Sequence, residues 1–244
     1  MIRVGIGGWN YEPWNETFYP PKLAAAKQLE YASSKVTAIE INATFYRTQS
    51  AASFKKWADA TPENFMFSVK APRAAVQRKD LREAEESIEW FFKSGVSELG
   101  AKLGPVFWQM APYKKFDLAE MTAYFDLLPE KLKQLPLRHA LEVRHASFQD
   151  EAFLKLARER NIAVVTVESE KHPLIAEPTA NFAYARLELT QADELTGYPK
   201  AALKKWAATA RAWEKGGDVF LYFISGAKER NPAAAMAMLE LLKA

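Results

Sequence analysis

The feature that most constrains this fold is a repeated alternation of short apolar runs with longer amphipathic segments. The runs are nearly continuous and rich in β-branched and aromatic residues, which is typical of strands buried on both faces. We predict strands at Arg3–Gly7, Thr37–Ile41, Met66–Val69, Pro105–Gln109, Ala140–Val143, Ala163–Val167, Phe182–Leu187 and Val219–Phe223. Helical patterns lie between most of them, at Leu23–Ser33, Ala51–Ala60, Asp80–Leu99, Leu118–Leu128, Glu151–Arg160, Lys200–Lys215 and Pro232–Leu242.

Strands that alternate with helices indicate right-handed βαβ units and a parallel sheet. About eight such units in 244 residues fit a TIM-type (β/α)8 barrel of the α/β class better than an open doubly wound sheet. The segment from Glu168 to Asn181 contains Pro173 and Pro178 and shows no helical period, so we expect the sixth helix to be short or missing. No Gly/Ser-rich linker divides the chain, and residues 1–244 are predicted to form one domain.

An open nucleotide-binding sheet would need a phosphate-binding loop after the first strand. Gly5, Gly7 and Gly8 are present, but Trp9-Asn10-Tyr11 follow and no helix begins there. Glycines without a helix start lack the amide groups that hold a pyrophosphate. We therefore predict no nucleotide cofactor.

Composition excludes several other classes. The chain has no cysteine, which rules out a disulfide framework, a thiolate nucleophile, a cysteine-bound zinc ion and an iron–sulfur cluster. Its formal net charge of +3 is too small to indicate a nucleic-acid partner by itself. No segment approaches the roughly 18 consecutive apolar residues of a membrane helix, and the first residues lack the pattern of a secretory signal. We expect a cytoplasmic protein with no membrane partner.

Polar and aromatic side chains gather at the carboxyl ends of the predicted strands, where barrel enzymes carry their chemistry. Two carboxylates and a histidine there can transfer protons, and we predict as catalytic residues Glu40, Glu142 and His145. Aromatic, amide and cationic side chains at the same ends suit a polar or anionic ligand. We predict as substrate-binding residues Trp9, Tyr11, Asn42, Tyr46, Lys70, Gln109, Arg144 and Arg186.

The same charges have a second interpretation. Buried glutamates and arginines are rarely alone, so these residues would also suit a purely structural ion network inside the barrel. A metal site built from Glu40, Glu142, Glu168 and His145 is disfavoured because Lys70 and two arginines crowd the same space with positive charge. We predict no metal.

Two further histidines and four tryptophans are expected to have structural or solvent-exposed positions. His139 precedes the fifth strand at its amino end, and we expect a structural role. His172 lies in a proline-flanked loop, and we expect it to be solvated. Four tryptophans on predicted helices are expected to pack against the barrel: Trp57, Trp90, Trp206 and Trp213.

The motifs along the whole chain resemble those of the YecE-like family, the domain-of-unknown-function family numbered 72. The resemblance rests on Gly7-Gly8-Trp9-x-Tyr11-x-x-Trp14, Glu40-Ile41-Asn42-x-Thr44-Phe45-Tyr46, Phe65-x-Phe67-Ser68-x-Lys70, Leu103-Gly104-Pro105-x-x-x-Gln109, Glu142-x-Arg144-His145-x-Ser147, Tyr184-x-Arg186 and Asp218-Val219-x-x-Tyr222-Phe223. It implies a TIM-barrel fold. It implies no reaction, because no activity is established for that family.

This sequence departs from the family pattern at the ends of three strands. Ile224-Ser225 stands where the family usually has Asn-Asn, Leu187-Glu188-Leu189 where a His-Gly is common, and Glu168 where an Asp is usual. The first two changes remove polar groups from the expected pocket. Two interpretations therefore follow: this protein acts on a different substrate from other members of the family, or it has lost the family's activity.

Three functions follow from these residues. The leading hypothesis is an enzyme, a hydrolase or an isomerase, that acts on a sugar or phosphorylated metabolite by general acid/base chemistry. The second is a binding module for single-stranded nucleic acid, and the small net charge of the chain disfavours this function. The third is a barrel that binds a metabolite without turning it over. The sequence pattern indicates no particular oligomeric state.

Overall fold

The computed structural model describes residues 1–243. Its main sheet contains β1 (Ile2–Gly7), β2 (Ala38–Ile41), β3 (Met66–Lys70), β4 (Leu103–Gln109), β7 (His139–Glu142), β8 (Ala163–Val164), β9 (Thr166–Glu168), β10 (Phe182–Leu187) and β11 (Asp218–Phe223). The order is β8-β7-β4-β3-β2-β1-β11-β10-β9, and every neighbouring pair is parallel.

The two edges of this sheet belong to one extended segment. β8 pairs with β7, β9 pairs with β10, and only Val165 separates β8 from β9. Residues 163–168 therefore connect both edges and nearly close the sheet into a barrel. The predicted TIM-type barrel is confirmed, with this segment as its sixth strand.

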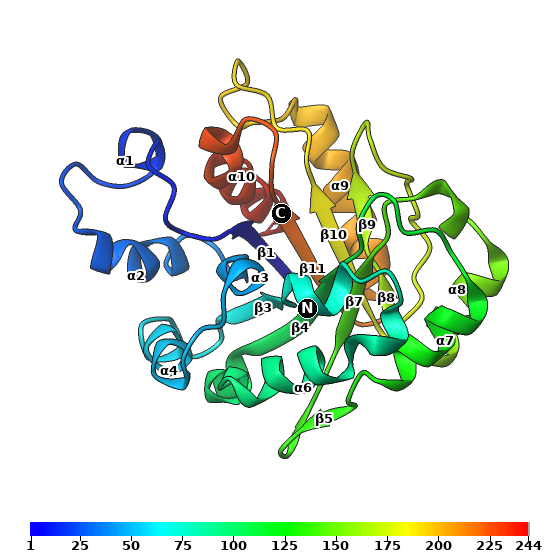
Figure 1. Cartoon of the computed structure of the whole chain (residues 1–244). Coiled ribbons are helices and arrows are strands. Elements are labelled where there is room, and N and C mark those ends of the chain that lie inside the picture. The colour runs from blue at the N-terminus through cyan, green and yellow to red at the C-terminus, as the bar shows by residue number, and fades with distance from the viewer. Residues whose placement is uncertain (244) are drawn as a thin grey trace.

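Helices surround the strands, as Figure 1 shows. They are α1 (Trp14–Thr17), α2 (Gln28–Ser33), α3 (Ala43–Tyr46), α4 (Ala51–Asp59), α5 (Arg73–Val76), α6 (Glu85–Lys93), α7 (Leu118–Asp126), α8 (Glu151–Glu159), α9 (Lys200–Glu214) and α10 (Asn231–Lys243). Short 3-10 helices cover Ala25–Lys27, Leu81–Ala84, Val96–Lys102, Ala146–Phe148 and Lys228–Arg230. Within the described chain no helix joins β9 to β10, so the missing sixth helix is also confirmed.

Several element boundaries differ from the sequence prediction. The single helix predicted at Asp80–Leu99 is wrong, because a 3-10 turn precedes α6 and another follows it. Gly95 ends the regular helix with a φ of 116°. The pattern also does not predict the short helices α1, α3 and α5, or the hairpin of β5 (Lys131–Leu132) and β6 (Leu135–Pro136).

Side chains that alternate along the strands fill the barrel interior and position the site. The interior cluster includes Ala38, Phe107, Ala140 and Tyr184, all buried. Side chains two residues apart share a side of a strand, and on these four strands the next inward position toward the carboxyl end is polar. These positions hold Glu40, Gln109, Glu142 and Arg186.

Gly5 makes room for this interior. A Cβ at Gly5 would lie 2.3 Å from the carbonyl oxygen of Ala38 and 2.8 Å from the Tyr222 ring. Strand β1 therefore approaches β2 closely, and the Tyr222 ring occupies the space that a side chain would need. No helix in residues 1–243 combines the length and apolar character required to cross a membrane.

Candidate functional site at the barrel mouth

Glu142 is the centre of a buried hydrogen-bond network at the carboxyl end of the barrel. Its Oε1 accepts from Gln109 Nε2 at 2.8 Å and from Arg144 Nε at 2.6 Å. Its Oε2 accepts from Arg186 Nη1 at 2.6 Å. The Glu142 side chain is completely buried. Both carboxylate oxygens are therefore engaged, two of the three donors being cationic.

Arg186 joins Glu142 to two further carboxylates. Arg186 Nη1 donates to Glu188 Oε1 at 2.9 Å, and Nε donates to Glu40 Oε2 at 3.2 Å. The Tyr184 hydroxyl also donates to Glu40 Oε2, at 2.7 Å. Arg186 and Glu40 are both buried, so their charges are compensated within the protein.

Lys70 lies at the other end of the network. Its Nζ donates to Gln109 Oε1 at 2.8 Å and is 4.3 Å from the centroid of the Phe45 ring. No carboxylate in residues 1–243 lies within the 4.0 Å ion-pair distance of this amine. The hydrogen bonds therefore run from Lys70 on β3 through Gln109 and Glu142 to Arg186 and Glu40.

The network shifts the pKa values of its members in different directions. Burial alone would raise the pKa of Glu142, but Arg186 and Arg144 outweigh it and hold that pKa at about 2. Burial lowers the pKa of Lys70 to about 8, although Glu40 opposes the shift. Burial raises the pKa of Glu188, and Arg186 opposes that shift. At neutral pH Glu142 is ionised. The pKa shifts of Lys70 and Glu188 instead favour the uncharged forms of these two side chains.

The structure thus brings together six of the predicted site residues through direct hydrogen bonds between side chains: Glu40, Glu142, Gln109, Arg144, Arg186 and Lys70. Asn42 reaches this region only through its amide, which donates to the Glu40 backbone carbonyl at 3.3 Å.

The other predicted residues lie outside the network. Trp9 packs edge-on against Trp57 at 5.2 Å between ring centroids, and Tyr11 packs against Trp14 at 5.6 Å. His145 Nδ1 accepts the Ser147 amide at 3.1 Å, which caps the short helix that follows. Tyr46 is 81% exposed. Their roles in binding or catalysis stay predictions.

Two side chains are placed differently from the sequence expectation. Trp90 does not pack against the barrel: it is 64% exposed, because α6 turns Ile88, Phe91 and Phe92 inward instead. His172 is not fully solvated, since its Nδ1 is buried without a hydrogen-bond partner. Burial lowers the pKa of His172, and the nearby Arg144 lowers it further. His172 therefore lies close to the network, which its loop position did not reveal.

His139 and Glu168 have structural partners. Trp108 Nε1 donates to His139 Nδ1 at 3.0 Å, and His139 Nε2 is 2.8 Å from the Pro129 carbonyl, which confirms the structural role expected for His139. Glu168 Oε1 accepts from Trp206 Nε1 at 2.8 Å, and its other oxygen accepts from the Tyr198 hydroxyl. Within residues 1–243 no group of three His, Asp or Glu side chains is arranged to hold a metal ion.

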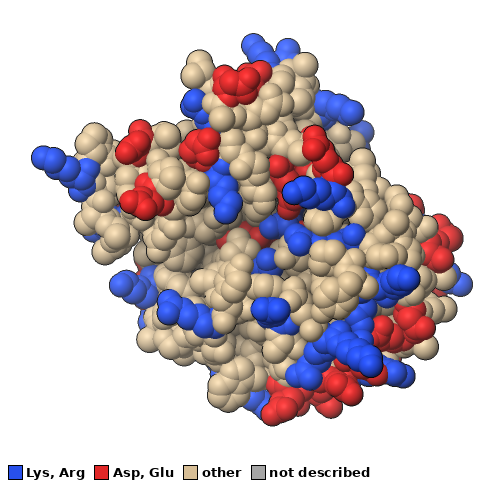
Figure 2. Space-filling model, turned by 45° about the horizontal axis from the view of Figure 1, so that its top comes forward, with Lys and Arg blue, Asp and Glu red and all other residues tan. Residues whose placement is uncertain are grey.

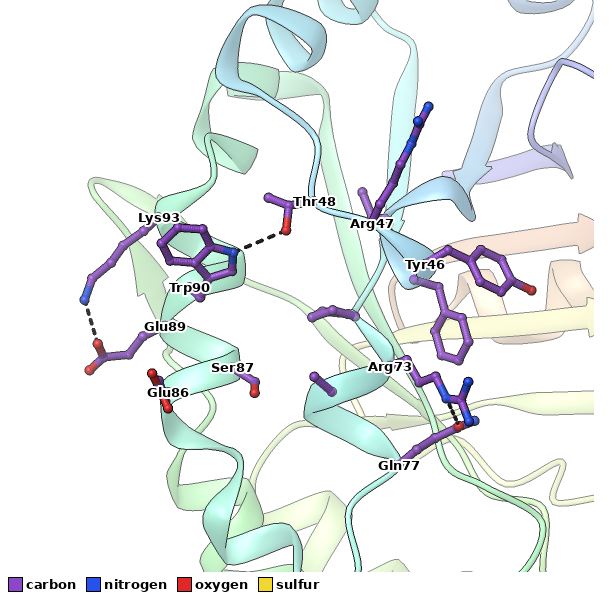
Figure 3. Close-up of a pocket in the computed structure, with 14 residues that line it drawn as sticks. Tyr46, Arg47, Thr48, Arg73, Gln77, Glu86, Ser87, Glu89, Trp90 and Lys93 are labelled. Carbon is purple, nitrogen blue, oxygen red and sulfur yellow. Dashed lines mark hydrogen bonds and ion pairs between the residues drawn. The ribbon is translucent and has the colours of Figure 1, made fainter.

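The mouth is hollowed, and two further clefts lie beside it. Figure 2 shows acidic side chains at the base of a hollow and basic side chains next to it. A cleft of about 500 Å³ is lined by Trp9, Asn42 and Trp57 among others. A larger groove of about 850 Å³ is lined by Tyr46, Arg47 and Trp90, together with residues of α5 and α6 (Figure 3).

Comparison with known proteins identifies the family. A model of the family described as "Protein of unknown function DUF72" matches residues 3–244. The chain belongs to the DUF72 family. The UPF0759 protein YunF of Bacillus subtilis is 32% identical over 184 residues, which cover 73% of this chain and 61% of YunF. The match thus spans less than two thirds of the length of that relative.

Solved structures support the barrel assignment. A DUF72 protein from Thermotoga maritima has a TM-score of 0.80 at 21% identity, with all of both chains covered. A DUF72 protein from Enterococcus faecalis has a TM-score of 0.79 at 18% identity, covering 100% of this chain and 96% of the other. A D-psicose 3-epimerase from Clostridium cellulolyticum has a TM-score of 0.56 at 11% identity, covering 99% and 98%. These likenesses show a shared fold.

Proposed function

We propose that this DUF72 protein is an enzyme that binds a small anionic substrate, a sugar phosphate or a sugar acid, at the mouth of its barrel. The observation that carries the proposal is the set of unused donors beside a network that is otherwise neutralised. Arg144 uses Nε for Glu142, and its two Nη groups have no hydrogen-bond partner within residues 1–243. In the described part of the chain, Lys70 has one hydrogen-bond acceptor, on Gln109, for three N–H groups.

An anion at the mouth would complete these contacts. Arg144 presents a planar pair of donors that matches a carboxylate or phosphate, and Lys70 adds a second positive charge. Glu142 already pairs with Arg144 through Nε, so Arg144 offers its two Nη groups to a substrate, and Lys70 offers an amine that has no carboxylate within ion-pair distance among residues 1–243. The low dielectric of the buried site strengthens that attraction.

The pKa values favour particular proton carriers. Lys70, with a pKa of about 8, can accept or release a proton near neutral pH, and the raised pKa of Glu188 suits a second carrier. Glu142 holds Arg144, Arg186 and Gln109 in place rather than moving protons itself. His145 and Glu40 stay candidates for the catalytic set. These groups support proton transfer, the chemistry of an isomerase or a hydrolase.

A ligand screen tests the proposal. Thermal unfolding is measured with sugar phosphates and sugar acids for the wild type, Arg144→Ala and, as a charge control away from the mouth, Lys133→Ala. A ligand at about 100 times its Kd adds roughly 2.7 kcal/mol to the free energy of unfolding. We expect this stabilisation in the wild type and in Lys133→Ala, and its loss in Arg144→Ala.

The opposite pattern would support the structural interpretation of the charges. If no anion stabilises the wild type and Arg144→Ala alone lowers the melting temperature strongly, the mouth is an internal ion network.

If the screen does identify a stabilising ligand, that ligand is assayed for turnover with the wild type, Lys70→Met and Glu188→Gln. Turnover that survives in both variants would remove these residues from the mechanism.

A binding protein without catalysis is the second candidate, and Ile224 is the observation that favours it. Ile224 is buried in the cluster inside the barrel, so the end of β11 offers an apolar side chain to the mouth. Saturable binding of an anion without any product would support this candidate over the enzyme.

A further inference from the structure

The groove beside α6 shares no residue with the hydrogen-bond network of the mouth. Its walls are α3 with the residues that follow it, α5, and the outer face of α6 (Figure 3). Its volume of about 850 Å³ is enough for several sugar rings or nucleotides. None of the hydrogen-bonded residues Lys70, Gln109, Glu142 and Arg186 lines it.

Two large aromatic side chains that line this groove are exposed. Tyr46 is 81% exposed and Trp90 is 64% exposed. The Trp90 Nε1 donates to Thr48 Oγ1 at 3.2 Å across the groove, which fixes the orientation of the indole (Figure 3). Exposing two aromatic rings in one concavity costs hydrophobic free energy that a bound ligand would recover.

The lining of the groove contains three basic side chains and two acidic ones. Arg73 donates to Gln77 at 2.7 Å, and Lys93 pairs with Glu89 at 2.6 Å. The side chains of Arg47 and Glu86, also in the lining, make no hydrogen bond or ion pair within the described residues. Within the described residues, Arg47 and Arg73 therefore have no carboxylate partner and Glu86 has no cationic partner, so the groove offers both hydrogen-bond donors and an acceptor.

We propose that this groove binds a neutral carbohydrate chain. Pyranose rings have apolar faces of C–H groups that pack against aromatic rings, and hydroxyl groups that both donate and accept hydrogen bonds. Trp90 and Tyr46 supply the rings, while Arg47, Gln77 and Glu86 supply the polar partners. Glu86 and Glu89 offset most of the positive charge of the lining, so the groove has too small a net charge to favour a polyanion such as single-stranded nucleic acid. This binding does not depend on the chemistry proposed for the mouth.

The test measures binding of four neutral hexasaccharides, built from β-1,4-glucose, α-1,4-glucose, β-1,4-xylose and β-1,4-N-acetylglucosamine, by calorimetry and tryptophan fluorescence. We expect at least one to bind, with affinity reduced about tenfold or more in Trp90→Ala and largely kept in Trp90→Phe. The control is Tyr113→Ala, because Tyr113 is 66% exposed but lies outside this groove. Its affinity should equal that of the wild type.

Three results would overturn the proposal. The first is that none of the four hexasaccharides binds at millimolar concentration. The second is binding that Trp90→Ala leaves unchanged while its melting temperature shows a folded protein. The third is salt-dependent binding of a ten-nucleotide oligothymidylate that Trp90→Ala abolishes, because that would assign the groove to single-stranded nucleic acid.

Discussion

At the scale of single residues, the mouth shows how one buried carboxylate is kept ionised. Burial opposes the charge on Glu142, but Arg186 and Arg144 contact its two oxygens and hold its pKa at about 2, below the ordinary value of 4.5. The proton is therefore bound more weakly by the folded chain than by the unfolded chain. Glu142 stabilises the fold above about pH 4.5, and this contribution is lost as the pH falls toward 2.

Glu142→Gln tests this contribution. The change leaves Arg186 and Arg144 without their shared anion, so we expect a loss of about 3 kcal/mol in the free energy of unfolding at pH 7. The difference from wild type should shrink between about pH 4.5 and pH 2, because the wild-type carboxylate becomes protonated there. Urea unfolding across this pH range measures it.

The matched control for this substitution is Glu240→Gln. Glu240 is exposed and, among residues 1–243, pairs only with Lys243, so its neutralisation should change stability little. A difference between Glu142→Gln and wild type that stays constant from pH 7 to pH 2 would show that the Glu142 pKa is not lowered.

At the scale of elements, α6 illustrates how a tertiary contact overrides a helical pattern. The apolar spacing favours one helix at Asp80–Leu99, yet regular α-helix covers only Glu85–Lys93. Gly95 adopts a φ of 116° and approaches α4 so closely that a Cβ would lie 2.5 Å from the Ala51 Cα. The helix ends where the chain must pass the start of α4.

Gly95→Ala should therefore destabilise the protein. An alanine at this φ is strained and its methyl group meets backbone atoms that cannot move freely, so we expect a loss of about 3 kcal/mol. Gly216→Ala is the control, because its Cβ would meet one atom at 3.4 Å, an ordinary contact. Denaturant unfolding of both variants measures the difference. Equal stability of the two would contradict the role of Gly95.

At the scale of the whole molecule, barrel closure depends on one strand that contributes no side chain near the middle of the interior. β1 lies between β2 and β11, and the Gly5 backbone approaches both Ala38 and Tyr222. The Tyr222 hydroxyl in turn is 2.7 Å from Ser68 Oγ on β3. The aromatic side chains of the interior can fill the barrel only because β1 leaves this space.

Gly5→Ala should prevent the barrel from closing normally. The new methyl group would lie 2.3 Å from a backbone oxygen, and we expect a loss above about 4 kcal/mol or no soluble protein. Gly7→Ala, on the same strand, would meet side-chain atoms of Ile224 and Asn42 at 3.2 and 3.3 Å, which can shift. Soluble yield and denaturant midpoints compare the two. A Gly5→Ala variant as stable as Gly7→Ala would contradict this account.

Much of the fold could be predicted from local pattern. All eight predicted strands are present, because nearly continuous apolar runs specify strands buried on both faces. The convergence of Glu40, Glu142, Gln109 and Arg186 also follows from sequence, since each is the polar position two residues beyond a buried inward side chain. The functional meaning of that convergence stays a prediction.

The sequence by itself determined the barrel, its missing sixth helix and the gathering of charges at one mouth, because strand and helix periodicity are local properties and their regular alternation favours a parallel sheet. Only the tertiary structure decided which charges neutralise each other, and so left Arg144 and Lys70 with unused donors. It also decided that Trp90 faces a groove, because a helix face is buried or exposed according to what packs beside it. Contacts between residues far apart in the chain are set by packing, which a single sequence does not display.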